Sequence, residues 1–307
     1  MRRAGTDASA LRLPGPWTHR GVSANGIRLQ VAECDGGGPL VVLLHGFPEF
    51  WWSWRHQLPA LAERGYRVVA VDLRGYGGSD KPPRGYDPFT LARDVAGVVK
   101  ALGERRAVLV GHGWGGYVGW ATAVLHPREV TALCAVSAPH PLQMLRSLRV
   151  GGSTAALAHL LAAQPPLLPE RRLSDPAGGF LRAHLTGWSG PGASFPDEEA
   201  LARYQAALRL WPAPHCALEY HRWLLRSRLR ADGRRFNRLM GSPVHRPVCT
   251  IVGDADPVLP RAAEVPPRLV AGGLRSHRMP GVGHFPAEED PAGFDTLLLA
   301  WLADLSG

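Results

Sequence analysis

Residues 108–116 read VLVGHGWGG, an apolar run that ends in glycines placed around one histidine and one tryptophan. The β-branched residues of the run favour a buried strand, and the glycines allow a tight turn directly after it. From Trp114 to residue 125, apolar residues recur at helical spacing. The stretch therefore predicts a strand, a sharp turn and a helix, which is the repeating order of α/β proteins.

The same alternation continues on both sides. Apolar runs at 27–32, 40–44, 67–71 and 130–136 predict strands, and residues 91–102 predict a further crossover helix. Strand character returns at 248–252 and 275–279 and is followed by an amphipathic helix at 292–305. We expect an α/β fold with a mainly parallel central sheet and flanking helices.

One long region interrupts this pattern. Residues 139–243 are rich in Arg and Pro and lack strand-like runs, so they predict a helical lid above the carboxyl ends of the strands. The core then consists of residues 17–138 and 244–307. Residues 1–16 are expected to form a disordered or loosely ordered leader.

Composition limits the partners and the compartment. The 307 residues are 45% hydrophobic and 20% charged, without the roughly 18 to 20 uninterrupted apolar residues of a membrane span. No apolar segment follows the N-terminal arginines, so we expect a cytoplasmic protein. The net charge of +9 comes almost wholly from arginines that no stacking aromatics accompany, which argues against nucleic acid as a partner. The sequence does not set the oligomeric state.

The four cysteines give no sign of a disulfide framework or a metal site. They lie far apart, without the spacing that metal ligands show, at positions Cys34, Cys134, Cys216 and Cys249. No cofactor and no metal are expected.

Two turns supply candidate hydrogen-bond donors. The turn at 108–116 has the layout of a nucleophile elbow, in which the central residue, here Gly113, stands at a helix N-terminus. HGFPEF at 45–50 follows a second apolar run, and a turn at a strand end leaves backbone N–H groups free. We predict an oxyanion hole from the N–H groups of Phe47 and Trp114. His45, Pro48 and His112 are expected to contact the substrate.

Asp256 and His284 are the candidate acid and base. They follow two strand-like runs, in VGDADPVLP and GVGHFPAEEDP, in the order acid then histidine. The carboxylate would fix one tautomer of the imidazole and leave the other ring nitrogen free to take a proton. Asp254, two residues earlier, is the rival acid.

Four strings, HGFPEF, DLRGYGGSDKP, GHGWGG and GVGHF, resemble those of the epoxide hydrolase and haloalkane dehalogenase branch of the α/β-hydrolases. The resemblance extends from about residue 17 to 305 and implies an α/β-hydrolase fold with a small-molecule substrate. In epoxide hydrolases the string that matches GHGWGG is GHDWGG, and its aspartate attacks the epoxide to form an alkyl-enzyme ester. By this resemblance Gly113 stands in place of the nucleophile and leaves no side chain to attack.

The lid strings HLLAAQPPLLPE and EYHRW match the segments that carry two substrate-binding tyrosines in epoxide hydrolases. That alignment places His159 and His221 at the tyrosine positions. Tyr220 is one residue out of register and on a helix points about 100° away from His221, so it replaces a phenol only if the helix is rotated. We expect all three to bind substrate, in a protein that has diverged from ordinary epoxide opening.

Three hypotheses remain open. In the first, the Asp256–His284 dyad activates water without a covalent aspartyl intermediate, or abstracts a substrate proton as in a lyase, an isomerase or a cofactor-free oxygenase. In the second, the protein is a catalytically inactive pseudo-hydrolase that binds a small molecule. In the third, His159, His221 and His284 bind zinc, although no motif fixes their spacing.

Overall fold

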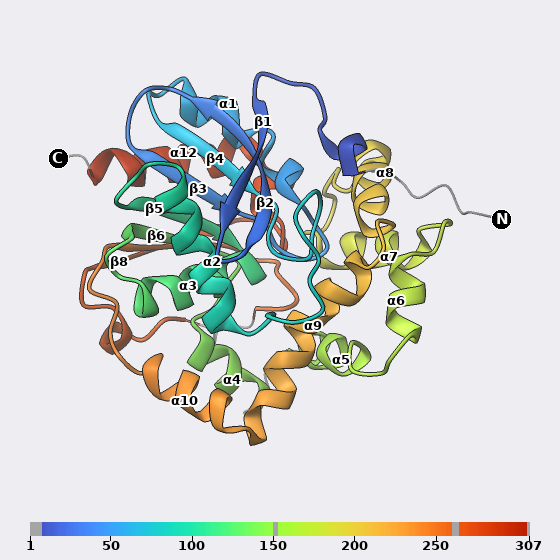
Figure 1. Ribbon diagram of the computed structural model, residues 1–307. Helices are drawn as coiled ribbons and strands as arrows, with labels where there is room; N and C mark the ends of the chain where they lie inside the picture. Colours follow the sequence, from blue (N-terminus) through green and yellow to red (C-terminus); the bar gives the residue numbers. More distant parts are fainter. Residues whose placement is uncertain (1–7, 150–152, 260–263, 306–307) are drawn as a thin grey trace.

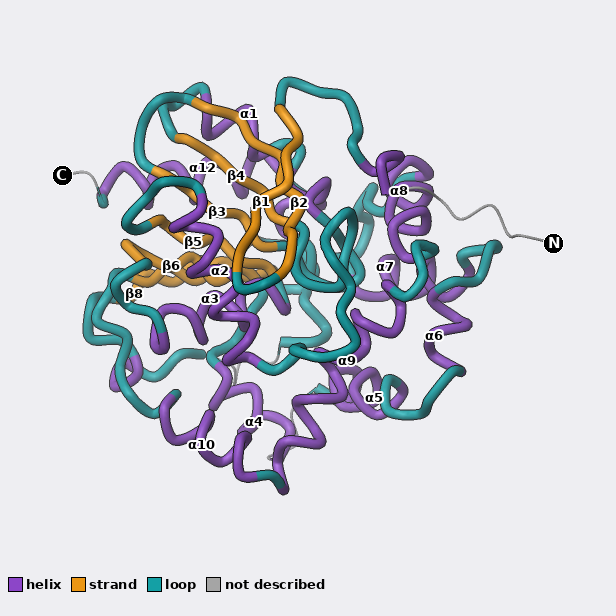
Figure 2. Tube along the Cα trace, viewed as in Figure 1, coloured by secondary structure: helices purple, strands orange, loops and turns teal. Residues whose placement is uncertain are grey.

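The computed structural model describes residues 8–149, 153–259 and 264–305. Eight strands form one sheet in the order β1-β2-β4-β3-β5-β6-β7-β8 (Figures 1 and 2). The strands β1 and β2 pair antiparallel, as do β2 and β4, and all the other pairs are parallel, which confirms the mainly parallel sheet. The bounds are β1 Thr18–Ala24, β2 Ile27–Asp35, β3 Leu40–Leu44, β4 Arg67–Val71, β5 Ala107–His112, β6 Val130–Val136, β7 Val248–Gly253 and β8 Leu274–Met279.

Helices cover both faces of the sheet (Figure 1). The helices α1 (Gln57–Ala62) and α12 (Pro291–Asp304) contact each other on one face, while α2 (Pro88–Ala101) and α3 (Trp114–Leu125) pack together on the other. Every residue of β3 and of β5 is buried, as expected for strands that are covered on both sides. These two strands position the two glycine-containing turns.

The described residues between β6 and β7 form helices and no strand, on one side of the sheet (Figure 2). These helices are α4 Pro141–Arg149, α5 Thr154–Ala162, α6 Leu168–Leu173, α7 Gly179–Trp188, α8 Glu198–Leu208, α9 Ala213–Arg226 and α10 Ala231–Leu239. The side chain of Ser153 caps α5 and that of Asp197 caps α8, because each accepts a hydrogen bond from a backbone N–H in the first turn. The exact lid boundaries, 139 and 243, stay a prediction.

Two features of the N-terminal region differ from expectation. The strand β1 was not predicted, because it lies at the edge of the sheet and buries only Val22 and Ala24. Part of the expected leader packs against the core, since Leu11 and Leu13 are buried and Trp51 donates its indole N–H to the Leu11 carbonyl over 3.0 Å. Residues 1–7 lie outside the described residues.

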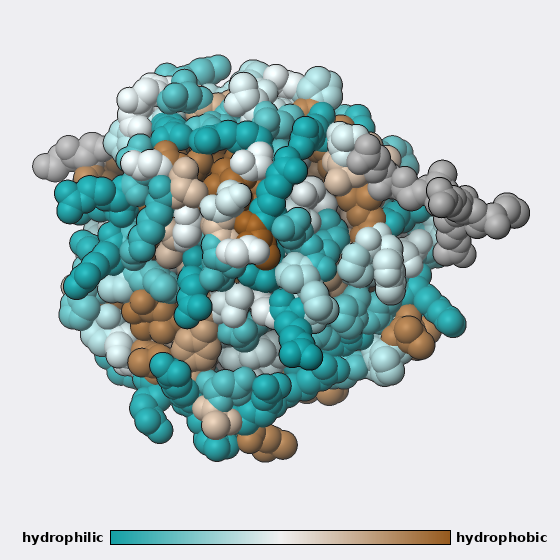
Figure 3. All heavy atoms as spheres, in the orientation of Figure 1, coloured by the Kyte–Doolittle hydropathy of each residue, from teal (hydrophilic) through white to brown (hydrophobic). Residues whose placement is uncertain are grey.

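The surface and the cysteines have ordinary features. Figure 3 shows a mainly hydrophilic face with scattered apolar side chains. None of the described helices has the length and apolar character needed to cross a membrane. All four cysteines are buried and free.

Candidate active site

Gly113 lies at the sharp turn between β5 and α3. Its φ of 50° and ψ of −115° fall where residues with a side chain are strained. The flanking glycines are needed for close packing, because a Cβ on Gly111 or Gly115 would clash with backbone atoms. A Cβ on Gly113 would instead lie 3.6 Å from the Gly46 Cα and 3.7 Å from the His284 Nε2, both ordinary contacts. The turn therefore leaves open space above Gly113, beside the His284 ring.

His284 and Asp256 form the hydrogen bond that the sequence predicted. Their Nδ1 and Oδ2 atoms lie 2.8 Å apart, and both side chains are buried. The other Asp256 oxygen accepts hydrogen bonds from the backbone N–H groups of Val258 and Leu259, at 2.7 and 3.2 Å. Asp254 is exposed, and its side chain accepts a hydrogen bond from the backbone N–H of Gly281, in the turn that follows β8. Asp254 is therefore not the partner of His284.

The backbone N–H groups of Phe47 and Trp114 donate no hydrogen bond within the described part of the chain. Trp114 is the first residue of the 12-residue helix α3, so its N–H lies at the positive end of the helix dipole. Both residues line the same pocket as Gly113 and His284. Backbone donors that no carbonyl has taken up are what an oxyanion hole requires, and the oxyanion hole itself stays a prediction.

The pocket under the lid is small and mainly apolar. It has a volume of about 80 Å³, which holds several waters or a compact organic group. Its walls come from the core and the lid and are formed by Phe47, Gly113, Trp114, Tyr117, Ser137, Pro139, Met144, Ala156, His159, Leu160, Trp188, His221, Val258, Leu259 and His284.

His159 and His221 line the pocket as predicted, but they bind each other. The His221 Nδ1 lies 3.1 Å from the Ala217 carbonyl oxygen, which can only accept, so Nδ1 carries the proton. The His221 Nε2 is therefore the acceptor, and its one lone pair is shared by the Trp114 indole N–H and the His159 Nε2–H, each at 2.9 Å. Burial lowers the pKa of His159 to about 4 and lowers that of His221 well below its usual range. Both rings are neutral, and neither has a free ring N–H at Nε2 for a ligand.

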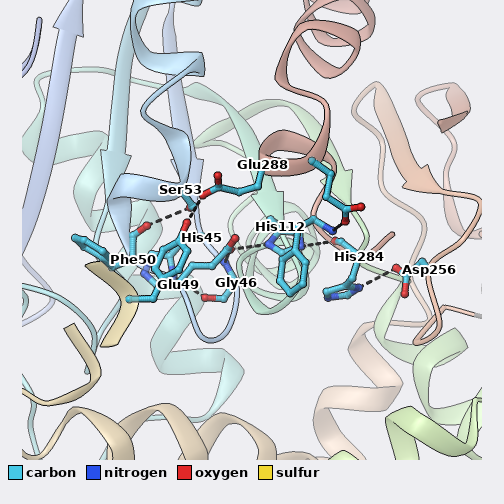
Figure 4. A network of polar contacts seen from close by, with 12 residues as sticks. His45, Gly46, Glu49, Phe50, Ser53, His112, Asp256, His284 and Glu288 are labelled. Atoms are coloured by element: carbon cyan, nitrogen blue, oxygen red, sulfur yellow. Dashed lines mark hydrogen bonds and ion pairs between the residues drawn. The ribbon is translucent and has the colours of Figure 1, made fainter. Parts of the chain in front are cut away.

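A buried ion pair lies behind the dyad (Figure 4). The Glu49 Oε2 is 2.7 Å from the His112 Nδ1 and accepts from the Gly46 N–H at 3.1 Å. The His112 Nε2–H donates to the carbonyl oxygen of His284 over 2.8 Å. Burial opposes both charges, yet the attraction and the hydrogen bond between the partners raise the pKa of His112 and lower the pKa of Glu49. The pair connects both glycine-containing turns to the His284 loop.

A second carboxylate, Glu289, fixes the same loop from the other side. It accepts hydrogen bonds from the backbone N–H groups of Gly190, Gly283 and Phe285, at 2.7, 2.8 and 2.9 Å. The intervening His284 N–H donates to the Trp188 carbonyl over 2.8 Å. The loop is thus bound to the end of the lid helix α7.

Four residues predicted to contact substrate do not line this pocket. His45 is fully buried, with Nδ1 at 2.8 Å from the Gly46 carbonyl and Nε2 accepting from the Leu73 N–H at 3.1 Å. His112 belongs to the ion pair, and Pro48 is buried away from the cavity. The Tyr220 hydroxyl donates to the Arg74 carbonyl over 2.7 Å, so it does not replace a lid phenol.

Trp188 and Ser137 line the pocket but were not predicted, and neither was His184, which packs against Trp188. Trp188 and His184 stand four residues apart on α7, and their ring centroids are 4.0 Å apart, so helical spacing was the available signal. Ser137 follows β6 with a φ of 45°, and its buried hydroxyl has no hydrogen-bond partner among the described residues. Its place at the carboxyl end of a predicted strand was the signal there.

The zinc hypothesis is not supported. Nowhere in residues 8–149, 153–259 or 264–305 do three His, Cys, Asp or Glu side chains stand where they could hold a metal ion. His159 and His221 share a hydrogen bond instead of converging on a common point.

Comparisons with known proteins agree on one family. Residues 41–296 match the model of the alpha/beta hydrolase family. Epoxide hydrolase A of Mycobacterium tuberculosis is 35% identical over 331 aligned residues, which cover 95% of this chain and 99% of that protein.

Solved structures give the same result. An epoxide hydrolase from an endophytic Streptomyces has a TM-score of 0.81 and 31% identity, with 95% of this chain and 97% of the other covered. Epoxide hydrolase A from Mycobacterium thermoresistibile has a TM-score of 0.80 and 29% identity, with 94% and 98% covered. This chain therefore belongs to the α/β-hydrolase family, in its epoxide hydrolase-like branch.

Proposed function

We propose that the protein is a hydrolase of small organic molecules that uses the Asp256–His284 dyad without a covalent aspartyl intermediate. One observation carries the proposal. The hydrogen bond between acid and base is intact at 2.8 Å, while the turn beside it carries Gly113, which has no side chain to attack a substrate.

The dyad is arranged to act on water. An ionised Asp256 carboxylate has no proton to donate and accepts from the His284 Nδ1–H. The neutral ring then has its lone pair on Nε2, next to the space above Gly113. A water in that space would give its proton to Nε2 as it attacks the substrate, and the Asp256 carboxylate would stabilise the imidazolium that forms. In this proposal the water takes the role of nucleophile that the resemblance gives to an aspartate in the epoxide hydrolases.

The donors of the site suit a carbonyl electrophile better than an epoxide. The backbone N–H groups of Phe47 and Trp114 have no acceptor in the described chain and belong to residues that line the pocket, so they would bind a carbonyl oxygen as it gains negative charge. An epoxide oxygen would rely on donors from the lid, and the His159 Nε2–H is bound to His221. Slow hydrolysis of a compact apolar ester or related carbonyl compound is the activity expected from this arrangement.

A single turnover in ¹⁸O water tests the proposal. With a panel of aryl acetates and aryl epoxides, we expect the label in the product and none in any protein carboxylate, as read by peptide mass spectrometry. Asp256→Asn should reduce kcat by about 10³ to 10⁴-fold, because it removes the group that fixes the tautomer. Asp254→Asn is the matched control, because that carboxylate is exposed and does not contact His284.

Two results would overturn the proposal. Label in an aspartate or glutamate after one turnover would show that another carboxylate acts as nucleophile. Unchanged turnover in Asp256→Asn would show that the dyad has no part in the reaction.

A further inference from the structure

We propose that the space above Gly113 binds the carboxylate of a small apolar monocarboxylic acid. The inference rests on the proposed function, because it names the ligand class of the same pocket. It also gives the acid a place in the reaction, since hydrolysis of an ester leaves a carboxylic acid as one product.

The first step is the space itself. A Cβ on Gly113 would lie 3.6 Å from the Gly46 Cα and 3.7 Å from the His284 Nε2, so no described atom crowds the direction in which a side chain would point. Gly113 and His284 both line the pocket, so a ligand atom can lie above the turn, in van der Waals contact with the Gly113 Cα. The Cβ position of Gly115 is blocked by the backbone of Leu44. The opening is thus specific to the turn residue and leads into the pocket.

The second step is the set of donors around it. The Trp114 N–H begins the 12-residue helix α3, whose positive end favours an anion. The Phe47 N–H is the second donor, and neither group has an acceptor within the described residues. Two unpaired N–H donors and the positive end of a helix favour a carboxylate oxygen at this position.

The third step is the His284 side chain, of which only 7% is exposed. Its Nδ1 is bound to Asp256, and its Nε2 has no partner in the described chain and faces the space above Gly113. A carboxylate placed there can bind a protonated Nε2–H. Binding of the anion then takes up a proton, which a neutral ligand of the same shape would not do.

The pocket walls define the remainder of the ligand. None of the described residues that line the cavity is Lys, Arg, Asp or Glu, and the walls include Trp114, Tyr117, Met144 and Trp188. His159 and His221 are neutral and bound to each other. The site can therefore hold one carboxylate at its base, joined to a compact apolar or aromatic body.

The test compares phenylacetate with phenylacetamide, which has nearly the same shape and no charge. We expect isothermal titration calorimetry to show phenylacetate binding about tenfold or more tightly, because charge-assisted hydrogen bonds exceed neutral ones by that much. Titrations in buffers of different ionisation enthalpy should show proton uptake with phenylacetate alone. Gly113→Asp places a carboxylate of the chain in the space, so this variant should lose the preference while it still binds phenylacetamide.

A spectroscopic measurement on the unmodified protein covers the case in which Gly113→Asp does not fold. The ¹⁵N signals of His284 should move toward imidazolium with phenylacetate and stay in place with phenylacetamide. Equal affinities for the two ligands, or unchanged phenylacetate binding in a folded Gly113→Asp variant, would overturn the inference. These measurements need no turnover, so a failure of the carboxylate-binding inference does not contradict the hydrolase proposal. Conversely, a protein that shows no turnover but prefers phenylacetate would contradict the hydrolase proposal and support the carboxylate site.

Discussion

Replacing Glu49 by Gln tests the buried ion pair that connects the two glycine-containing turns to the catalytic loop. The Glu49 side chain is 2% exposed, and its Oε2 serves both the His112 Nδ1 and the Gly46 N–H. Gln has the same size but no charge and one oxygen. If the Gln oxygen accepts from the Gly46 N–H, the unprotonated Nδ1 of a neutral His112 faces that oxygen, and two acceptors are in contact. If the Gln amide group instead donates to the His112 Nδ1, the Gly46 N–H loses its acceptor.

The size of the effect follows from this geometry. Removing one partner of a buried ion pair costs about 3 to 5 kcal/mol, and we expect about 3 kcal/mol here because His112 can shed its proton. The pKa of His112 is raised above 6.5, so its contribution is present below that value and is lost as the pH rises through the raised pKa. The pKa of Glu49 is lowered below 4.5, so its contribution is present above that value and is lost as the pH falls through the lowered pKa. The difference between wild type and variant is therefore largest between pH 4.5 and 6.5.

Guanidinium chloride unfolding, followed by tryptophan fluorescence at pH 4, 5.5 and 8.5, measures this difference. Glu199→Gln is the control, because it neutralises one member of an exposed ion pair with Arg203 and should leave the unfolding midpoint unchanged. A loss below about 1 kcal/mol at pH 5.5, or a loss that is constant across the three pH values, would refute the reasoning.

Three further predictions concern single side chains. Gly113→Asp and Gly113→Asn should each lower the free energy of unfolding in thermal denaturation by about 1 to 3 kcal/mol, because a residue with a side chain is strained at a φ of 50°. Only the Asp variant should form an ester with styrene oxide, which intact-protein mass spectrometry detects. Tyr220→Phe should cost about 1 to 3 kcal/mol in urea unfolding, because the buried Arg74 carbonyl loses its donor, and should leave kcat/KM for an ester substrate unchanged. Burial raises the pKa of Glu288 to about 7, so the contribution of the protonated carboxyl to stability is present below pH 4.5 and is lost as the pH rises through 7. Between pH 5 and pH 8 the free energy of unfolding of Glu288→Gln should therefore fall by about 3 kcal/mol less than that of the wild type.

The sequence predicted the parts of the site that depend on position along a strand. Asp256 and His284 each follow a strand of the parallel sheet, and the carboxyl ends of such strands meet at one edge, so their contact could be foreseen. The open turn at Gly113 could be foreseen for the same reason, because a strand, glycines and a helix fix its geometry.

The sequence failed where side-chain direction decides the outcome. His112 is adjacent to Gly113 along the chain, yet its ring points behind the turn toward Glu49, and a motif does not specify this. Tyr220 and His221 are neighbours on α9 that point to different partners. The bond between His159 and His221 joins two lid helices, so it depends on packing that no local pattern encodes.

The three N–H groups bound by Glu289 have a consequence for how a ligand reaches the pocket. Gly190 ends the turn after α7, and Gly283 and Phe285 flank the catalytic histidine, so one carboxylate ties the two segments together. The last turn of α7 cannot swing outward without breaking these bonds or dragging His284 from Asp256. We therefore expect the α7 side of the pocket to stay in place when ligands enter or leave, so that His284 keeps its hydrogen bond to Asp256.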